Sequence, residues 1–308
     1  MKVLITGGSG MVGRNLLEHS EILKNKVYAP TRKDLNLLNY STVKNYLKKI
    51  KPDFIVHCAG RVGGIQANIN SPVEFLIENL EIGKNLVTAA QLVGIPSLIN
   101  LGSSCMYPKD LNGPISEDKL LTGVLEPTNE GYALSKIVVA RLCSYINLSD
   151  DKLSYKTIIP CNLYGKYDLF NSINAHLIPA IISKINSAMI HNETSVEIWG
   201  NGEARREFMY SGDLADFIAY AISKYDDMPE LLNVGIGTDY TINEYYKKVA
   251  DTLGFQGEFI HDLSRAVGMQ RKLTDITRVN NFGWRSSTGL SDGLVKTFQY
   301  FKEEIDHV

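Results

Sequence analysis

Short apolar runs alternate with longer helical patterns through the first half of the chain. The apolar runs predict strands at residues 3–5, 26–29, 54–56, 97–101 and 155–159. Apolar positions that recur every three or four residues predict helices at residues 11–18, 41–50, 71–92 and 130–148. We expect Ser41 to cap the second of these helices and Pro72 to open the third. Such alternation is typical of an α/β fold, in which helices cover both faces of a parallel sheet.

The pattern is looser after Pro160. Helices are predicted at residues 174–187, 211–224, 241–253 and 290–304, and strands at residues 196–199 and 232–234. Thr241 and Glu244 have the spacing of a capping box, which marks the start of the third of these helices. The weaker strand–helix alternation indicates a second, smaller region after the first sheet.

A glycine-rich loop joins the first predicted strand to the first predicted helix. Gly7 permits the tight turn, Gly10 lets the backbone approach a pyrophosphate, and Gly13 lets the helix pack on the strand. The helix N-terminus, with Met11 and Val12, offers free N–H groups to phosphate oxygens. The loop therefore predicts dinucleotide binding.

This loop, placed on the strand pattern, predicts a Rossmann-type doubly wound parallel sheet with a smaller C-terminal α/β substrate domain. We expect the dinucleotide domain to comprise residues 1–165 and 207–236. The substrate domain would comprise residues 166–206 and 237–308.

The second predicted strand ends in a basic segment. Arg32 and Lys33 follow Thr31, and the first carboxylate comes only at Asp34. An acidic residue at this place binds the ribose 2′-hydroxyl of NAD, whereas arginine accommodates the 2′-phosphate of NADP. The segment favours NADP(H); the alternative is that Arg32 and Lys33 are solvated loop charges.

Tyr132 and Lys136 lie one turn apart on a predicted helix, with Ser103 upstream after the fourth strand. A nearby ammonium favours phenolate, so we expect Tyr132 to exchange a proton near neutral pH. Alone, such a pair is usually plain helix surface. Together with Ser103 at the carboxyl edge of the sheet, it predicts a carbonyl reductase, in which Ser103 orients the carbonyl and Tyr132 donates the proton. Lys136 assists Tyr132 and holds the nicotinamide ribose.

Composition excludes several other classes of protein. The chain has 308 residues, of which 44% are apolar and 21% charged, and a net charge of -2 gives no basic footprint for nucleic acid. No apolar run is long enough to span a membrane, and the N-terminus has no signal-peptide layout. The scattered cysteines Cys58, Cys105, Cys143 and Cys161 indicate reduced thiols in the cytoplasm, and neither they nor the six histidines form a metal site.

These motifs resemble those of the extended short-chain dehydrogenase/reductases that act on nucleotide sugars, and most closely the GDP-L-fucose synthase family. The resemblance covers nearly the whole chain and rests on specific stretches at residues 62–68, 101–108, 125–130, 162–165, 176–180 and 271–273. It implies NADPH-dependent reduction of the C4 ketone of a GDP-4-keto-6-deoxy sugar, together with epimerisation at C3 and C5. It also implies a homodimer formed by the helices at residues 71–92 and 130–148.

The resemblance implies further site residues. Cys105 and His176 match the acid and base of the epimerisation, which a C4 ketone permits because it acidifies the C3 and C5 hydrogens. The cofactor wall would include Leu101, Gly102, Pro160, Asn162, Leu163 and His176. The GDP-sugar would contact Ser104, Lys184, Trp199, Arg206 and Lys272, with Trp199 stacking and the last two neutralising the diphosphate. Two alternatives assign no proton transfer to these residues. Cys105 would be a buried core residue, and His176 would only hydrogen-bond the substrate or cofactor.

The chain departs from the family pattern at several positions. Ser9 stands where the family has a basic residue, Gly131 where it has proline, and Cys161 where it has threonine; residues 209–213 differ as well. A related GDP-4-keto heptose, with epimerase activity lost or weak, is therefore an alternative substrate. A 4,6-dehydratase needs carboxylates after Ser103, which the chain lacks, and Arg32 disfavours an NAD-dependent 4-epimerase. A non-catalytic NADP-binding protein is the remaining alternative.

Overall fold

Six parallel strands form the central sheet of the computed structural model, which describes residues 1–170, 175–264 and 269–306. Their spatial order is β11-β6-β4-β3-β1-β2. The strands are β1 (Lys2–Thr6), β2 (Lys26–Tyr28), β3 (Phe54–His57), β4 (Ser97–Leu101), β6 (Ser154–Pro160) and β11 (Leu231–Val234). The chain moves outward from β1 to β2 and then returns to the other side of β1 with β3, so the order reverses between β1 and β3. The predicted α/β fold with a doubly wound parallel sheet is confirmed.

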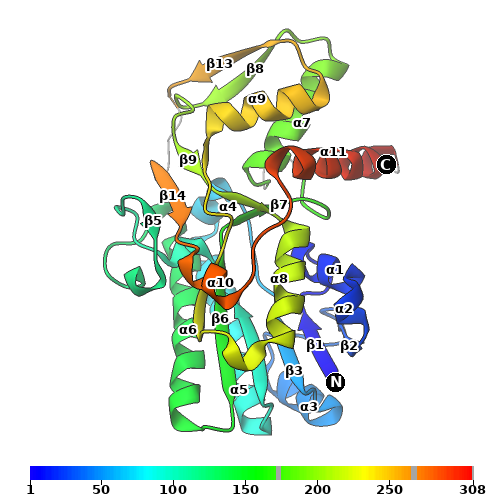
Figure 1. Cartoon of the computed structure of the whole chain (residues 1–308), viewed down its shortest axis with the longest axis vertical. Coiled ribbons are helices and arrows are strands. Elements are labelled where there is room, and N and C mark those ends of the chain that lie inside the picture. Colours follow the sequence, from blue (N-terminus) through cyan, green and yellow to red (C-terminus); the bar gives the residue numbers. More distant parts are fainter. Residues whose placement is uncertain (171–174, 265–268, 307–308) are drawn as a thin grey trace.

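Helices cover both faces of this sheet (Figure 1). Val3 and Ile5 pack with α1 (Met11–Glu18) and α8 (Ser211–Ser223). Leu4, between them, points to the opposite face and packs with α3 (Tyr40–Ile50), α5 (Pro72–Val93) and α6 (Glu130–Ser149). The strand period of two thus sends alternate side chains of β1 into two separate cores.

Two glycines allow α5 and α6 to approach closely. A Cβ on Gly83 would lie 2.4 Å from Cγ2 of Val139, and one on Gly131 would lie 2.9 Å from the Pro72 carbonyl oxygen. The second contact involves backbone, which cannot move aside as a side chain can. Gly131, where the family has proline, is therefore suited to the helix packing of this chain.

A second region lies at the upper end of the molecule in Figure 1. It contains α7 (Leu177–Ile190), β8 (Ser195–Trp199), α9 (Ile242–Leu253), β13 (Glu258–Asp262) and α11 (Leu290–Asp306), and Ile181, Tyr245 and Phe301 lie in its own apolar core. Shorter elements complete the chain: α2 (Ser20–Leu23), α4 (Ile65–Asn70), β5 (Pro114–Ile115), β7 (Asn162–Tyr164), β9 (Arg205–Arg206), β10 (Phe208–Tyr210), β12 (Tyr240–Thr241), β14 (Arg271–Thr274) and α10 (Thr277–Phe282).

Local capping agrees with the sequence at one helix and corrects it at another. The capping box of α9 is confirmed, because Thr241 Oγ1 accepts from the Glu244 N–H at 3.0 Å while Glu244 accepts from the Thr241 N–H at 2.6 Å. The prediction that Ser41 caps α3 is wrong. Asn39 holds that position, since its Oδ1 accepts from the Thr42 N–H at 3.0 Å.

The helix predicted at residues 174–187 begins at Leu177, and its predicted first residue, Asn174, lies outside the described residues. No helix in the described ranges has the length and apolar character needed to cross a membrane.

Candidate active site

A cavity of about 660 Å³ runs along the carboxyl edge of the sheet. Thr6, Cys58, Leu101 and Pro160, at the ends of β1, β3, β4 and β6, contribute to its wall. All the predicted catalytic and cofactor residues line it, as does Ser104: Gly7, Gly10, Met11, Val12, Gly13, Arg32, Leu101, Gly102, Ser103, Cys105, Tyr132, Lys136, Pro160, Asn162, Leu163 and His176. Parallel sheets bind ligands at this edge, where the strand order reverses.

The conformation of the glycine loop leaves space for a ligand beside Gly10. Gly7 has φ +73°, and a Cβ on Gly13 would lie 2.2 Å from the Gly7 carbonyl oxygen. The fold alone, without a ligand, therefore requires glycine at both positions. Gly10 differs, because the nearest protein atom to its Cβ would be that oxygen at 3.5 Å, an ordinary contact. No side chain caps α1, which leaves its first N–H groups available to an anion. A pyrophosphate fits these observations.

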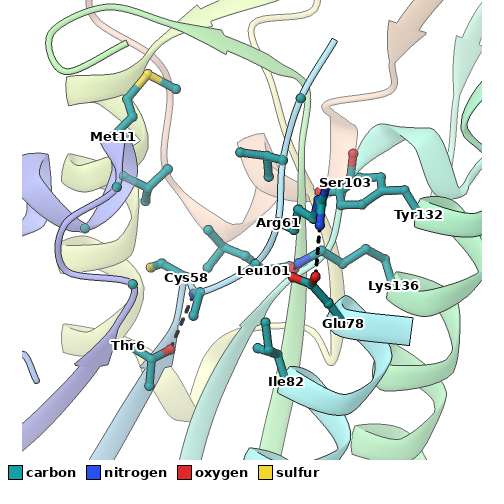
Figure 2. A pocket seen from close by; sticks show the side chains of 18 of the residues that line it. Thr6, Met11, Cys58, Arg61, Glu78, Ile82, Leu101, Ser103, Tyr132 and Lys136 are labelled. Atoms are coloured by element: carbon teal, nitrogen blue, oxygen red, sulfur yellow. Dashed lines mark hydrogen bonds and ion pairs between the residues drawn. The ribbon is translucent and has the colours of Figure 1, made fainter. Parts of the chain in front are cut away.

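The far end of the cavity carries positive charge. Arg32 lines it, whereas the Asp34 carboxylate turns back to accept from Oγ1 and N–H of Thr31 at 2.7 and 3.1 Å. The one acidic lining residue in the described chain is Glu78, which is paired with Arg61 at 2.9 Å (Figure 2). With no free carboxylate beside Arg32, this end suits a 2′-phosphate better than a 2′-hydroxyl.

Ser103, Tyr132 and Lys136 lie together on one side of the cavity, across from Met11 (Figure 2). Ser103 follows β4 and hydrogen-bonds the Tyr132 hydroxyl, and α6 supplies the other two. Lys136 is 8% exposed, and its Nζ donates to the Leu101 carbonyl at 2.9 Å. The three side chains therefore lie together beside the carboxyl end of β4.

The ionisation of Tyr132 differs from the sequence-based expectation. Burial raises the pKa of its phenol, negative charge at Cys105 raises it further, and the Ser103 hydrogen bond offsets these only in part. The Lys136 ammonium lies 5.8 Å from the ring centroid and is itself disfavoured, because burial lowers its pKa to about 8. The expectation of a lowered phenol pKa is therefore wrong for the enzyme without ligands, in which Tyr132 is protonated.

Cys105 has polar partners that favour its thiolate. Its Sγ accepts from Nζ of Lys272 and from Nδ2 of Asn129, each at 3.3 Å. Burial raises the pKa of this thiol, but the charge of Lys272 and hydrogen bonds from Ser103, Lys272 and Asn129 outweigh burial and leave the pKa below its ordinary value. The other three cysteines have raised pKa values because they are buried.

His176 lines the same cavity from the start of α7. Burial lowers the pKa of its imidazole, and the Lys272 ammonium lowers it further. A single lysine thus acts on both residues that the sequence assigns to epimerisation. The ring is neutral at neutral pH in the absence of ligands.

The remaining predicted substrate residues lie outside the cavity lining. Lys272 pairs with Arg206 across β14 and β9 and lies behind Cys105. Lys184 and Trp199 form a separate pair in the second region, with Nζ 5.2 Å from the centre of the indole. The structure therefore brings Arg206 and Lys272 to the reacting centre and keeps Lys184 and Trp199 with each other.

Among the lining residues that the sequence analysis did not assign to the site, Asn68 and Asn129 each have a side-chain oxygen without a hydrogen-bond partner in the described part of the chain. Asn129 donates to Cys105, and its Oδ1 is buried without a hydrogen-bond partner among the described residues. Asn68 of α4 is 6% exposed and also has a buried, unpartnered Oδ1, while its Nδ2 donates to the carbonyls of Gly63 and Gly64. Their only signal in the sequence is membership of the family-specific stretches at residues 62–68 and 125–130.

Comparisons with known proteins agree with this geometry. The model of the NAD dependent epimerase/dehydratase family matches residues 3–235. A GDP-L-colitose synthase from Yersinia pseudotuberculosis is 55% identical over 304 residues, 99% of each chain. A GDP-L-fucose synthase from Azorhizobium caulinodans is 46% identical over 303 residues, 97% of this chain and 96% of the relative.

Among solved structures, a GDP-mannoheptose C4 reductase from Campylobacter jejuni with NADP bound has a TM-score of 0.88 at 30% identity, and the match covers 98% of each chain. The fold, the cavity and these relatives agree with the family that the sequence motifs resemble. The chain therefore belongs to the NAD dependent epimerase/dehydratase family, as an oxidoreductase of the extended short-chain dehydrogenase/reductase type within the GDP-L-fucose synthase group.

Proposed function

We propose that the chain uses NADPH to reduce the C4 ketone of a GDP-4-keto-6-deoxy sugar and inverts stereocentres beside that ketone. The observation that carries the proposal is a single cavity lined by the glycine loop, by Ser103, Tyr132 and Lys136, and by Cys105 and His176. Reduction and epimerisation act on neighbouring atoms of one sugar, so both sets of groups must face the same bound ketone.

The cofactor site is assigned from the glycine loop outward. The N–H groups of Met11 and Val12 would hold the pyrophosphate, Arg32 the 2′-phosphate, and Lys136 the nicotinamide ribose. When bound, NADPH supplies the hydride for C4. Ser9 offers no positive charge to the 2′-phosphate, so Arg32 carries that preference.

For reduction, the protein must orient the ketone and deliver one proton. Ser103 donates a hydrogen bond to O4, where negative charge develops as C4 is reduced. Tyr132 then transfers its phenolic proton to O4. Its raised pKa keeps that proton in place until charge on O4 draws it away. The Lys136 ammonium next to the ring stabilises the phenolate that remains.

For epimerisation, Cys105 and His176 work on the carbons flanking the ketone. The Cys105 thiolate removes a proton from carbon, and the C–H electron pair moves to O4 as an enolate. To act as the acid, His176 first takes a proton from solvent and becomes an imidazolium. It gives this proton to the opposite face of the carbon, and the enolate electrons form the new C–H bond. The Cys105 thiol then loses its proton to solvent, so one proton enters and one leaves in each cycle. Lys272 lies beside the sulfur and favours the thiolate at the start of this cycle.

The relatives favour two variants of the substrate. Colitose is the 3-deoxy counterpart of fucose, so a colitose-type substrate has no stereocentre at C3 and only C5 is inverted. The 55% identity with a GDP-L-colitose synthase supports this variant over the 46% match to a GDP-L-fucose synthase. A GDP-4-keto heptose remains the second candidate, because the matched Campylobacter jejuni structure is a GDP-mannoheptose C4 reductase.

The deciding experiment combines a substrate panel with two variants. Purified enzyme is given NADPH and GDP-4-keto sugars (6-deoxyhexose, 3,6-dideoxyhexose and heptose) in deuterated water, and products are identified by NMR. We expect Tyr132→Phe to lower the rate of NADPH oxidation by about 10²-fold or more while leaving the NADPH dissociation constant within about threefold. We expect Cys105→Ser to stop deuterium entering the carbons beside the ketone.

Three outcomes contradict the proposal. Normal turnover by Tyr132→Phe removes the assigned acid, and undiminished deuterium exchange in Cys105→Ser removes the assigned base. Absence of NADPH oxidation with every sugar of the panel refutes the reductase itself. Reduction without exchange in the wild type leaves a C4 reductase that has lost its epimerase activity.

We further propose a homodimer formed through α5 and α6. Leu134, Val138, Tyr145 and Leu148 follow one stripe of α6 and are 38%, 48%, 63% and 83% exposed. Val73 and Ile77 continue the apolar surface on α5. An apolar stripe on two adjacent helices is typical of a covered interface.

The division into domains and the cellular location are also proposed. Residues 1–165 and 207–236 would form the cofactor domain, and residues 166–206 and 237–308 the substrate domain. The return of the chain to the sheet at β11 supports this division. All four cysteines are free, which suits the reducing cytoplasm where nucleotide sugars for polysaccharide synthesis are made.

A further inference from the structure

Lys272 reaches Cys105 from a strand that is remote in sequence. β14 runs parallel to β9, with Arg271 opposite Arg205 and Lys272 opposite Arg206. Because successive side chains of a strand point to opposite faces, Arg205 and Arg271 share one face while Arg206 and Lys272 share the other. The second face is the one that meets Cys105.

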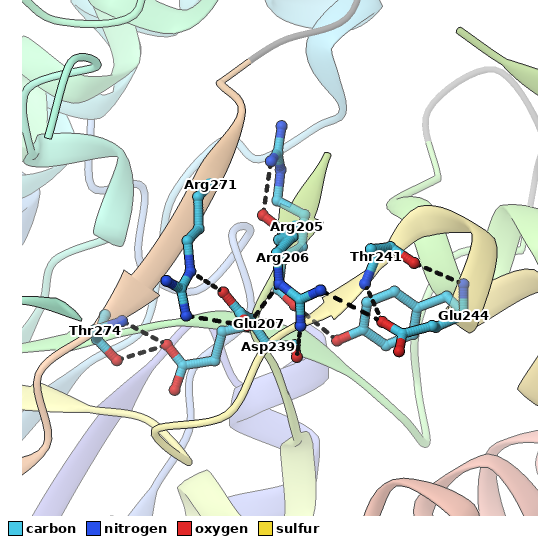
Figure 3. A network of polar contacts seen from close by, with 9 residues as sticks. Arg205, Arg206, Glu207, Asp239, Thr241, Glu244, Arg271 and Thr274 are labelled. Atoms are coloured by element: carbon cyan, nitrogen blue, oxygen red, sulfur yellow. Dashed lines mark hydrogen bonds and ion pairs between the residues drawn. The ribbon is translucent and has the colours of Figure 1, made fainter. Parts of the chain in front are cut away.

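The face that points away is fixed by a buried carboxylate (Figure 3). Asp239, whose side chain is 4% exposed, accepts from Nε of Arg205 at 3.0 Å and from Nε of Arg271 at 2.5 Å. Further along β14, the Glu207 carboxylate accepts from N–H and Oγ1 of Thr274 at 2.8 and 2.6 Å. These contacts hold the β14 strand on both sides of Lys272.

The ammonium of Lys272 is buried beside the Cys105 sulfur. Lys272 is 8% exposed, and among the described residues the Cys105 sulfur is the only hydrogen-bond acceptor of its Nζ, at 3.3 Å. Nδ2 of Asn129, the residue before α6, donates to the same sulfur, also at 3.3 Å. A sulfur that receives two N–H donors, one of them charged, is bound as an acceptor and not as an S–H donor.

We propose that Lys272 is the counter-ion of a Cys105 thiolate, and that it is a positioning residue which prepares this thiol to act as a base. The use of the thiolate as a base rests on the proposed function, whereas the ion pair does not. The sequence assigned Lys272 to the diphosphate of GDP. The contact at Cys105 gives it a role before any substrate binds.

The other groups around the sulfur are consistent with an anion there. Arg206 adds a second positive charge beside Lys272, and Ser103 and Asn129 contribute neutral hydrogen-bond donors. Tyr132 is held protonated and His176 neutral, so neither brings a negative charge to the thiolate. The Glu126 carboxylate acts on Arg206.

The test is a thiolate titration without substrate. Absorbance at 240 nm is followed from pH 5 to 10, and iodoacetamide labelling of Cys105 is followed by mass spectrometry. In the wild type we expect a step below the ordinary thiol pKa of about 8.5, which Cys105→Ser removes. In Lys272→Met the step should move up by at least about one pH unit, which lowers the alkylation rate at pH 7 about tenfold. Lys272→Arg should restore most of the shift.

Lys247→Met, at an exposed lysine of α9, is the matched control and should titrate like the wild type. The proposal is overturned if Lys272→Met titrates like the wild type. It is equally overturned if the wild-type Cys105 step lies at or above about 8.5, a measurement that needs no variant to fold. A low thiol pKa without deuterium exchange into substrate would instead contradict the epimerase assignment and leave the ion pair intact.

Discussion

Replacing Lys136 with methionine should make the protein without ligands more stable while destroying its activity. The ammonium is buried, with 8% exposure, and donates to one carbonyl, that of Leu101 at 2.9 Å. Burial lowers its pKa from 10.5 to about 8, so the folded protein holds this charge at a cost. Methionine has a similar length and carries no charge to be desolvated.

The magnitude follows from linkage between protonation and folding. A pKa lowered from 10.5 to about 8 removes about 3 kcal/mol from the free energy of unfolding at pH 7, at about 1.4 kcal/mol per pH unit. Losing the hydrogen bond to Leu101 costs about 1 kcal/mol. Lys136→Met should therefore raise the free energy of unfolding by about 2 kcal/mol at pH 7.

The pH dependence gives the prediction its sign. Between about pH 8 and 10.5 the unfolded chain binds more protons at Lys136 than the folded chain, so the wild-type contribution to stability rises with pH. At pH 9 the advantage of Lys136→Met should fall to about 1 kcal/mol. Other titrating groups are common to both proteins and cancel in the difference.

The assay is urea unfolding without cofactor, followed by fluorescence at pH 7 and pH 9. Lys156→Met is the matched control, because that lysine is 6% exposed but donates to three carbonyls, of Tyr225, Asp226 and Met228. Its removal takes away three hydrogen bonds instead of one and should destabilise the protein. A Lys136→Met protein that is less stable than the wild type at pH 7, or equally shifted at both pH values, would refute the reasoning.

Two further predictions concern the cofactor. Gly13→Ala should lower the free energy of unfolding by about 2 kcal/mol, because the new Cβ meets the Gly7 carbonyl oxygen at 2.2 Å. Gly10→Ala should leave thermal stability unchanged but weaken NADPH binding in a fluorescence titration. Equal destabilisation by both would show that Gly10 is also required by the fold. Arg32→Ala should raise the KM for NADPH about tenfold and leave the KM for NADH within about twofold; a parallel loss for both cofactors would remove Arg32 from the 2′-phosphate site.

The sequence predicts the sheet and the glycine loop well because their signals are local. The strand at residues 54–56 is a short apolar run, and it becomes the fully buried β3. Gly7 has the positive φ that suits the expected tight turn, and Gly13 has the close helix packing expected of it. The cap of α3 was misplaced by two residues because Asn39 and Ser41 are both good capping types, and only the backbone at residue 39 decides between them.

The surroundings of Cys105 could not be predicted in the same way. Arg206 and Lys272 lie on strands of two and four residues, too short for any periodicity, and the strands pair across a long stretch of chain. Lys272 meets Cys105 from 167 positions away. The ionisation of Tyr132 also depends on burial, which the spacing to Lys136 does not report.

The ionisation of Cys105 and that of Tyr132 are coupled. Negative charge on the sulfur raises the pKa of the Tyr132 phenol, so Tyr132 is the weaker acid while Cys105 is a thiolate. This coupling helps to keep the phenolic proton on Tyr132 while Cys105 is ready to act as a base. The order of the two proposed reactions follows from the ketone itself, which acidifies the C3 and C5 hydrogens and is removed by reduction. Epimerisation must therefore precede reduction.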